Sequence, residues 1–179
     1  VEWGIFWSYC FSELGYNVFL SPFTDNRLVL KGVEKMTAET CFPVKVFHGH
    51  VDYLLDHVDM LFLPNVITMP TPQSDETGYF CPLVESSQYM VKAALRIPDE
   101  KIIRPNLHMK EGPETLIESF QRSFPDQLRP NRPLLEKAVF AAWEKQMAFR
   151  RKLVEQGQEI ISQIPLDEPL WVVTGRPYN

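Results

Sequence analysis

The sequence has few cysteines and no long apolar run, and these shortages exclude several classes of protein. Its three cysteines, Cys10, Cys41 and Cys81, are an odd and sparse set in 179 residues, which argues against a secreted disulfide framework. No apolar stretch approaches the ~20 residues that cross a bilayer. The first residues lack the basic and apolar pattern of a signal peptide. We therefore expect a cytoplasmic protein with no membrane partner.

Motifs for nucleotides and nucleic acids are also missing. The chain has only 8 glycines, and it contains no G-x-x-x-x-G-K-[ST] phosphate loop, no G-x-G-x-x-G and no G-x-S-x-G elbow. A net charge of -5 gives no general basic surface for nucleic acid. We expect neither ATP binding through a familiar loop nor a nucleic-acid partner.

The residues that are present suit one globular domain, with 45% hydrophobic and 23% charged side chains. Helical periodicity and the punctuation by proline and glycine predict helices, with Thr24 as the N-cap of the second. Short apolar runs predict strands, and residues 65–80 read as a long loop. The predicted helices are 5–14, 25–32, 43–56, 83–94, 113–124 and 133–163, and the predicted strands are 16–20, 58–63, 101–104 and 170–174.

This alternation predicts an α/β fold with an open, largely parallel three-layer sheet of the flavodoxin or Rossmann kind. Because the chain begins in a helix and ends just after a strand, we expect it to be an excerpt of a longer protein. Residues 1–168 would form the α/β domain that carries the Cys41 and Cys81 loops. Residues 169–179 would be either the last strand of this domain or the first strand and turn of the next.

Two cysteines stand at predicted helix starts, in Cys41-Phe42-Pro43 and in Cys81-Pro82. Free backbone N–H groups and the helix dipole stabilise a thiolate, or a thiolate-bound metal centre, at such a position. If both helices begin at the carboxyl edge of one sheet, the thiols meet where α/β folds bind ligands. The alternative is that both pack as inert small hydrophobes, which we expect of Cys10. Spacing leaves both alternatives open for Cys41 and Cys81, because no C-x₂-C grouping is present.

Three residues near Cys41 are candidates to tune such a centre or to dock a partner: Glu39, Lys45 and His48. A solvated Lys45 is the simpler alternative for that side chain. His48 and His50 are two residues apart, so they face different directions on a helix and do not form a metal-binding pair.

Five stretches carry a resemblance to a known family: FWSYCFSELGYNVFLSP (residues 6–22), ETCFPVKVFHGHVDYLL (39–55), VDMLFLPN (58–65), CPLVESSQYM (81–90) and GRPYN (175–179). The chain resembles the uncharacterised domain of CoA enzyme activases and of proteins related to the 2-hydroxyacyl-CoA dehydratases. In those systems an ATP-hydrolysing activase passes one electron through iron–sulfur clusters to a dehydratase, which acts on 2-hydroxyacyl-CoA thioesters.

The resemblance implies a role in electron transfer or cluster carriage, with Cys41 and Cys81 as ligands of a [4Fe–4S] cluster. It implies an activase domain or a dehydratase subunit as the partner. Because a cubane cluster usually takes three or four protein ligands, the remaining ligands would come from beyond Asn179 or from another subunit. No complete active site is expected in this segment.

Two other functions stay open. One is a metal-free structural or interaction module with buried, unreactive cysteines. The other is an acyl-CoA-binding domain in which the loop at 65–80 covers the thioester.

Overall fold

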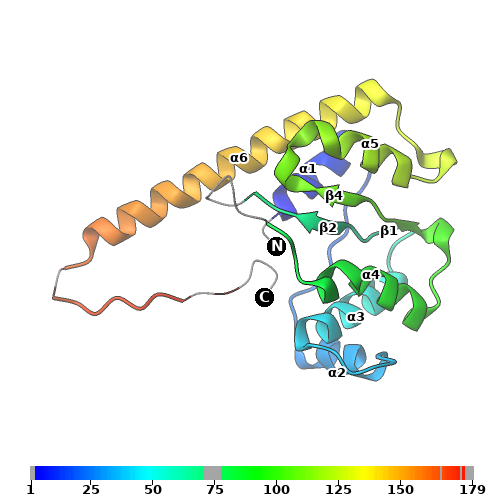
Figure 1. Ribbon diagram of the computed structural model, residues 1–179, viewed down its shortest axis with the longest axis horizontal. Helices are drawn as coiled ribbons and strands as arrows, with labels where there is room; N and C mark the ends of the chain where they lie inside the picture. The colour runs from blue at the N-terminus through cyan, green and yellow to red at the C-terminus, as the bar shows by residue number, and fades with distance from the viewer. Residues whose placement is uncertain (1–2, 71–77, 166, 174, 176–179) are drawn as a thin grey trace.

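The computed structural model describes residues 3–70, 78–165, 167–173 and 175. Helices dominate the described chain, and short strands lie between them (Figure 1). Single 3₁₀ turns lie at Asp99–Lys101, Met109–Glu111 and Asp126–Leu128. The helices and strands are α1 (Gly4–Glu13), α2 (Asn26–Glu34), α3 (Phe42–Leu55), β1 (Leu61–Phe62), β2 (Asn65–Thr68), α4 (Pro82–Leu95), β3 (Ile102–Ile103), β4 (Asn106–His108), α5 (Pro113–Ser123) and α6 (Arg132–Gln163).

The strands form two short parallel pairs, β1 with β3 and β2 with β4. Backbone bonds from Leu63 N to Ile103 O (3.0 Å) and from Asn65 N to Pro105 O (2.8 Å) connect the two pairs. In this parallel register, the amide at position 105 would donate to the Leu63 carbonyl, and a proline has no N–H to give. Pro105 therefore splits what would otherwise be one continuous two-stranded ribbon.

The α/β class is confirmed, but the described residues contain no open three-layer sheet of the flavodoxin kind. Helices lie on both sides of the narrow ribbon, with α1, α5 and α6 on one side and α3 and α4 on the other (Figure 1). Alternate strand residues face opposite sides, as the pleat requires. Leu61 and Ile102 belong to the cluster with α3 and α4, and Phe62 and Ile103 pack in the cluster with α1, α5 and α6.

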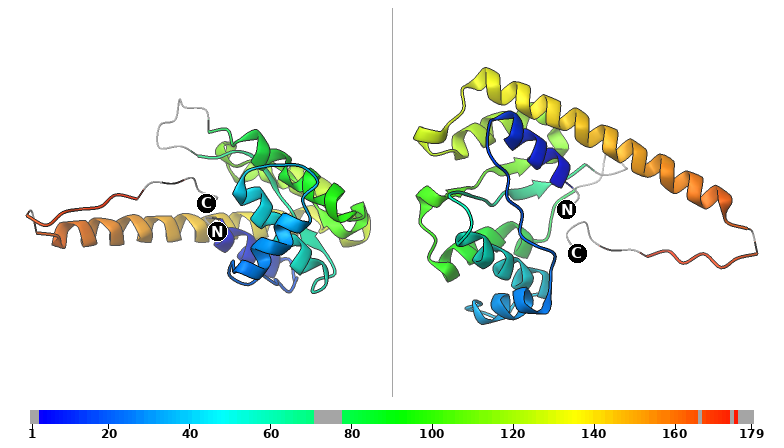
Figure 2. Two further views of the ribbon diagram at one scale, coloured as in Figure 1. Left: turned by 90° about the horizontal axis from the view of Figure 1, so that it is seen from below. Right: turned by 180° about the vertical axis from the view of Figure 1, so that it is seen from behind.

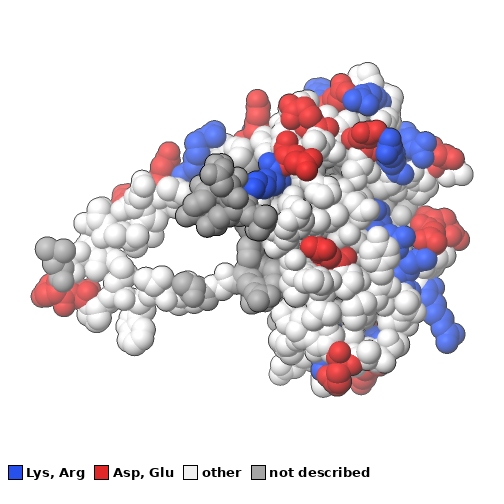
Figure 3. All heavy atoms as spheres, in the orientation of Figure 1, with Lys and Arg blue, Asp and Glu red and all other residues white. Residues whose placement is uncertain are grey.

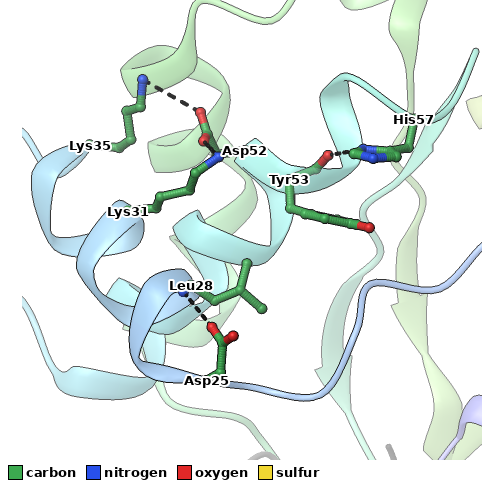
Figure 4. Close-up of polar contacts among 7 residues, drawn as sticks. All are labelled: Asp25, Leu28, Lys31, Lys35, Asp52, Tyr53 and His57. Carbon is green, nitrogen blue, oxygen red and sulfur yellow. Dashed lines mark hydrogen bonds and ion pairs between the residues drawn. The ribbon is translucent and has the colours of Figure 1, made fainter.

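The predicted helices are confirmed to within one or two residues at most ends. The capping residue of α2 is different, because Asp25 rather than Thr24 is the N-cap. Its Oδ1 accepts a hydrogen bond from Leu28 N at 2.9 Å (Figure 4), and carboxylates are strong N-caps. Thr24 instead pairs its Oγ1 with His50 Nε2 at 2.9 Å.

The strand predictions were less accurate. Residues 16–20 form no strand, and Leu20 is 71% exposed, because the apolar run finds no partner strand. Residues 170–173 are also exposed and form no strand, while residue 174 lies outside the described residues. The division at residue 168 stays a prediction.

The predicted loop at 65–80 begins with a strand, because residues 65–68 form β2. Residues 71–77 of that loop lie outside the described residues. Among the helices that the structure describes, α6 included, none combines the length and the apolar character needed to cross a membrane.

Two glycines set the contact between α2 and α3. A Cβ atom on Gly32 would lie 1.9 Å from Lys45 O, and one on Gly49 would lie 2.0 Å from Leu28 O. The helices therefore cross with their backbones in contact. Beside the crossing, the carboxylate of Asp52 forms ion pairs with the Nζ atoms of Lys31 and Lys35, each at 3.5 Å (Figure 4).

Gly32→Ala is expected to lower the free energy of unfolding by about 1–3 kcal/mol, because the clash is with backbone and cannot be relieved by a side-chain rotation. Denaturant titration measures this change. The matched control is Gly157→Ala, also in a helix but with nothing within 4 Å of the added methyl group. It should raise stability by about 0.5–1 kcal/mol. Equal effects of the two substitutions would contradict the close crossing.

Candidate functional site

Cys41 and Cys81 have the same local structure. Each is the N-cap residue of a helix that has proline in its first turn, α3 and α4 respectively, and each has an extended backbone (φ −67°, ψ 153° and φ −63°, ψ 134°). The Cys41 carbonyl accepts bonds from the amides three and four residues later, and so does the Cys81 carbonyl. Neither side chain makes a capping hydrogen bond. The prediction that both cysteines stand at helix starts is confirmed.

α3 and α4 begin at the same end of the strand ribbon. Parallel strands β2 and β4 run toward that side, and both α3 and α4 begin there (Figure 1). The two helices pack together through a cluster that includes Val51 on α3 and Val91 on α4. The N-cap residues Cys41 and Cys81 are therefore on the side toward which the strands run. Whether they share one ligand stays a prediction.

The three cysteines differ in exposure. Cys41 is exposed and Cys81 is partly buried, whereas Cys10 is fully buried among the aromatic rings of α1 and its neighbours. Burial raises the pKa of the Cys10 thiol to about 12, because a thiolate there would lose its hydration. This agrees with the structural role expected of Cys10.

Glu39 and Lys45 meet next to Cys41. Lys45 Nζ lies 2.8 Å from Glu39 Oε2, and this lysine holds the pKa of the Glu39 carboxyl below its usual range. The Glu39 side chain is 93% exposed and that of Lys45 only 20%. Lys45 is therefore the better fixed of the two charges, and its carboxylate partner can be exchanged for another anion at small cost.

His48 does not join this pair. It lies two turns after Cys41, is fully buried, and donates its Nδ1–H to Val44 O at 2.8 Å. With Nδ1 as the donor, a neutral ring leaves Nε2 as an acceptor, and Nε2 has no hydrogen-bond partner among the described residues. His48 is thus a buried polar group and not a surface residue beside Cys41.

Gln88 is the counterpart that sequence reasoning missed. It follows Cys81 by seven residues, as His48 follows Cys41, and seven residues are about two helical turns. It is 2% exposed, and its Oε1 has no hydrogen-bond partner in the described part of the chain. The sequence does contain this repeat, because a polar residue follows the cysteine by seven positions in both C-F-P-V-K-V-F-H and C-P-L-V-E-S-S-Q. α3 and α4 therefore each begin at a cysteine, and each carries a buried polar side chain two helical turns later.

The described residues contain no group of three or more His, Cys, Asp or Glu side chains that could hold a metal ion. The thiolates of Cys41 and Cys81 have the right chemistry for an iron–sulfur cluster, but they are two ligands. A cluster bound here would take its other ligands from outside the described residues.

The sequence was also compared with known proteins. The family described as the CoA enzyme activase uncharacterised domain matches residues 1–179.

The chain belongs to this family.

No curated protein and no solved structure matches the chain. Membership confirms the resemblance based on the five stretches, although Arg176–Asn179 lie outside the described residues. It connects the domain with CoA enzyme activases and assigns no chemistry to any residue.

We expect native protein to react with a thiol reagent such as DTNB at two cysteines, Cys41 and Cys81. Cys10 should react at least about a thousandfold more slowly at pH 8, because it is buried and its pKa is about 12. Absorbance kinetics on the wild type, Cys41→Ser and Cys81→Ser measure the rates. Cys10→Ala is the control and should leave the rapid phase unchanged. Three thiols reacting at one rate in the native protein would contradict this assignment.

Proposed function

We propose that this domain carries an iron–sulfur cluster for electron transfer in a CoA enzyme activase system, with Cys41 and Cys81 as thiolate ligands. The main support is the matched placement of the two thiols. Each is a helix N-cap whose side chain makes no capping hydrogen bond, and both helices start on the side toward which the strands run. An inert pair of core cysteines would have no reason to occupy two accessible helix starts.

The helix starts favour the charge that such a cluster brings. A thiolate-ligated iron–sulfur centre is usually anionic, and the first-turn amides and the dipole of a helix favour negative charge near its N-terminus. Lys45, one turn after Cys41, adds a cation whose present partner, Glu39, is almost fully exposed. In this proposal Lys45 lowers the free energy of the anionic centre and Glu39 is displaced toward solvent.

The number of thiols limits what the chain does alone. A [4Fe–4S] cluster has four iron sites, so Cys41 and Cys81 leave two for other ligands. These would come from another part of the parent protein or from an activase or dehydratase partner. When bound, the cluster supplies one-electron storage. The residues of this chain hold it at the strand edge and set the charge around it.

Anaerobic reconstitution with iron and sulfide, in the presence of dithiothreitol, tests the proposal. Dithiothreitol supplies exogenous thiolates for the iron sites that the chain does not ligate. The wild type should develop a broad charge-transfer band near about 400 nm and an EPR signal on reduction. Cys41→Ser and Cys81→Ser should each lower the bound iron by at least about tenfold. Cys10→Ala is the matched control and should bind iron as the wild type does.

A wild-type protein that stays colourless, both alone and with its activase partner added, would reject the cluster. Iron bound equally by the wild type and by the Cys41→Ser, Cys81→Ser double variant would show adventitious binding and would reject it too.

A further inference from the structure

The second half of α6 extends beyond the body of the domain (Figures 1 and 2). The buried residues of this helix end at Gln146. After that point the helix still carries large apolar side chains, and these are exposed: Phe149 is 36% exposed, Leu153 51% and Ile160 63%. Figure 3 shows open space between this part of the helix and residues 167–173, which return alongside it. Within the described chain, nothing covers these side chains.

The exposed residues continue a regular stripe. Leu135, Ala138 and Ala142 face the core from the first half of α6 at steps of three and four residues. Phe149, Leu153 and Ile160 follow on the same face at steps of four and seven, with the polar Gln156 between the last two, and a stripe of this period is typical of a helix that packs along another helix. A stripe of this kind exposed to water usually marks an interaction surface.

The stripe forms one wall of a groove of about 960 Å³ between α6 and α1. On the α1 side the groove is lined by the small residues Gly4, Ser8 and Ser12, one per turn, and by the larger Ile5 and Tyr9. Small residues let a third helix approach closely, and the apolar walls give it surface to bury. The groove therefore fits a helix with an apolar stripe of its own.

The charges beside the stripe indicate which helix that is. Lys152 and Glu159 are seven residues apart, so they lie on the same flank of α6. If a second α6 packs antiparallel with Phe149 of each copy opposite Ile160 of the other, the register is fixed. It places Leu153 opposite Gln156, and it brings Lys152 of each copy to within two residues, about 3 Å along the axis, of the level of Glu159 of the other. By two-fold symmetry, the Lys152–Glu159 and Phe149–Ile160 contacts each occur twice.

We propose that two copies of this chain associate through the outer halves of their α6 helices, packed antiparallel in the groove beside α1. The apolar stripe supplies the association energy. The paired Lys152 and Glu159 charges select the antiparallel register, because a parallel pair would place each of them opposite neutral residues. This surface lies on α1 and α6, apart from the helix starts that carry Cys41 and Cys81. The dimer proposal is therefore independent of the cluster proposal.

Charge reversal tests the register. Lys152→Glu and Glu159→Lys should each weaken the dimer about tenfold, because each puts two like-charge pairs at the interface. The double variant Lys152→Glu, Glu159→Lys restores both attractions and should recover wild-type affinity. The control Glu155→Lys lies about 200° around the helix from Leu153 and should have no effect.

Sedimentation equilibrium under reducing conditions measures the affinity, and circular dichroism checks that every variant is folded. Ile160→Asp should abolish the dimer without unfolding the chain, because Ile160 is 63% exposed in the single copy. A protein that remains monomeric up to about 1 mM overturns the proposal. A dimer that persists in Ile160→Asp overturns it as well. So does a double variant whose loss of dimer affinity is the sum of the losses in the two single variants.

Discussion

Parallel strands cannot be joined by a tight turn, so the chain between β2 and β4 has to cross back over the strand pair. In this domain α4 is that crossover, and its start must lie at the carboxyl end of β2. The chain first returns antiparallel beside β2, where Tyr79 is bridged to Thr68, and this return together with the crossover places Cys81 near the carboxyl end of β2. The position of Cys41 follows one step later, because α3 packs against α4 and begins on the same side. The close glycine crossing then places α2 on the outer surface of α3.

The helices could be predicted because their signals are local. Pro43, Pro82 and Pro113 stand in first turns, and apolar residues recur at helical steps. The strands could be predicted only in part, because the predicted strands 58–63 and 101–104 contain β1 and β3, whereas β2 and β4 were not expected. Residues 16–20 have a better strand composition than β2, yet only β2 finds a partner. Strand pairing depends on contacts far apart in the sequence, which no local pattern contains.

The candidate site divides in the same way. The N-cap positions of Cys41 and Cys81 were predictable from the prolines that follow them. The burial of His48 and Gln88 was not, because it depends on which faces of α3 and α4 are covered in the folded chain. The Glu39–Lys45 pair was expected only as two separate candidates, and the structure brings them together at 2.8 Å. The family match then confirms the activase context that the five stretches of sequence had indicated.

The prolines of the ribbon also affect how the folded domain behaves in a crowded solution. Leu63 N and Asn65 N point toward the β3–β4 strand, so position 64 between them points to the outer edge, where proline offers no donor. Beyond it, the same edge is occupied by bonds from Met69 N to Gly78 O and from Phe80 N to Ile67 O. A strand from another molecule therefore finds an interrupted edge, which protects a two-stranded ribbon against sheet extension and amyloid-like aggregation.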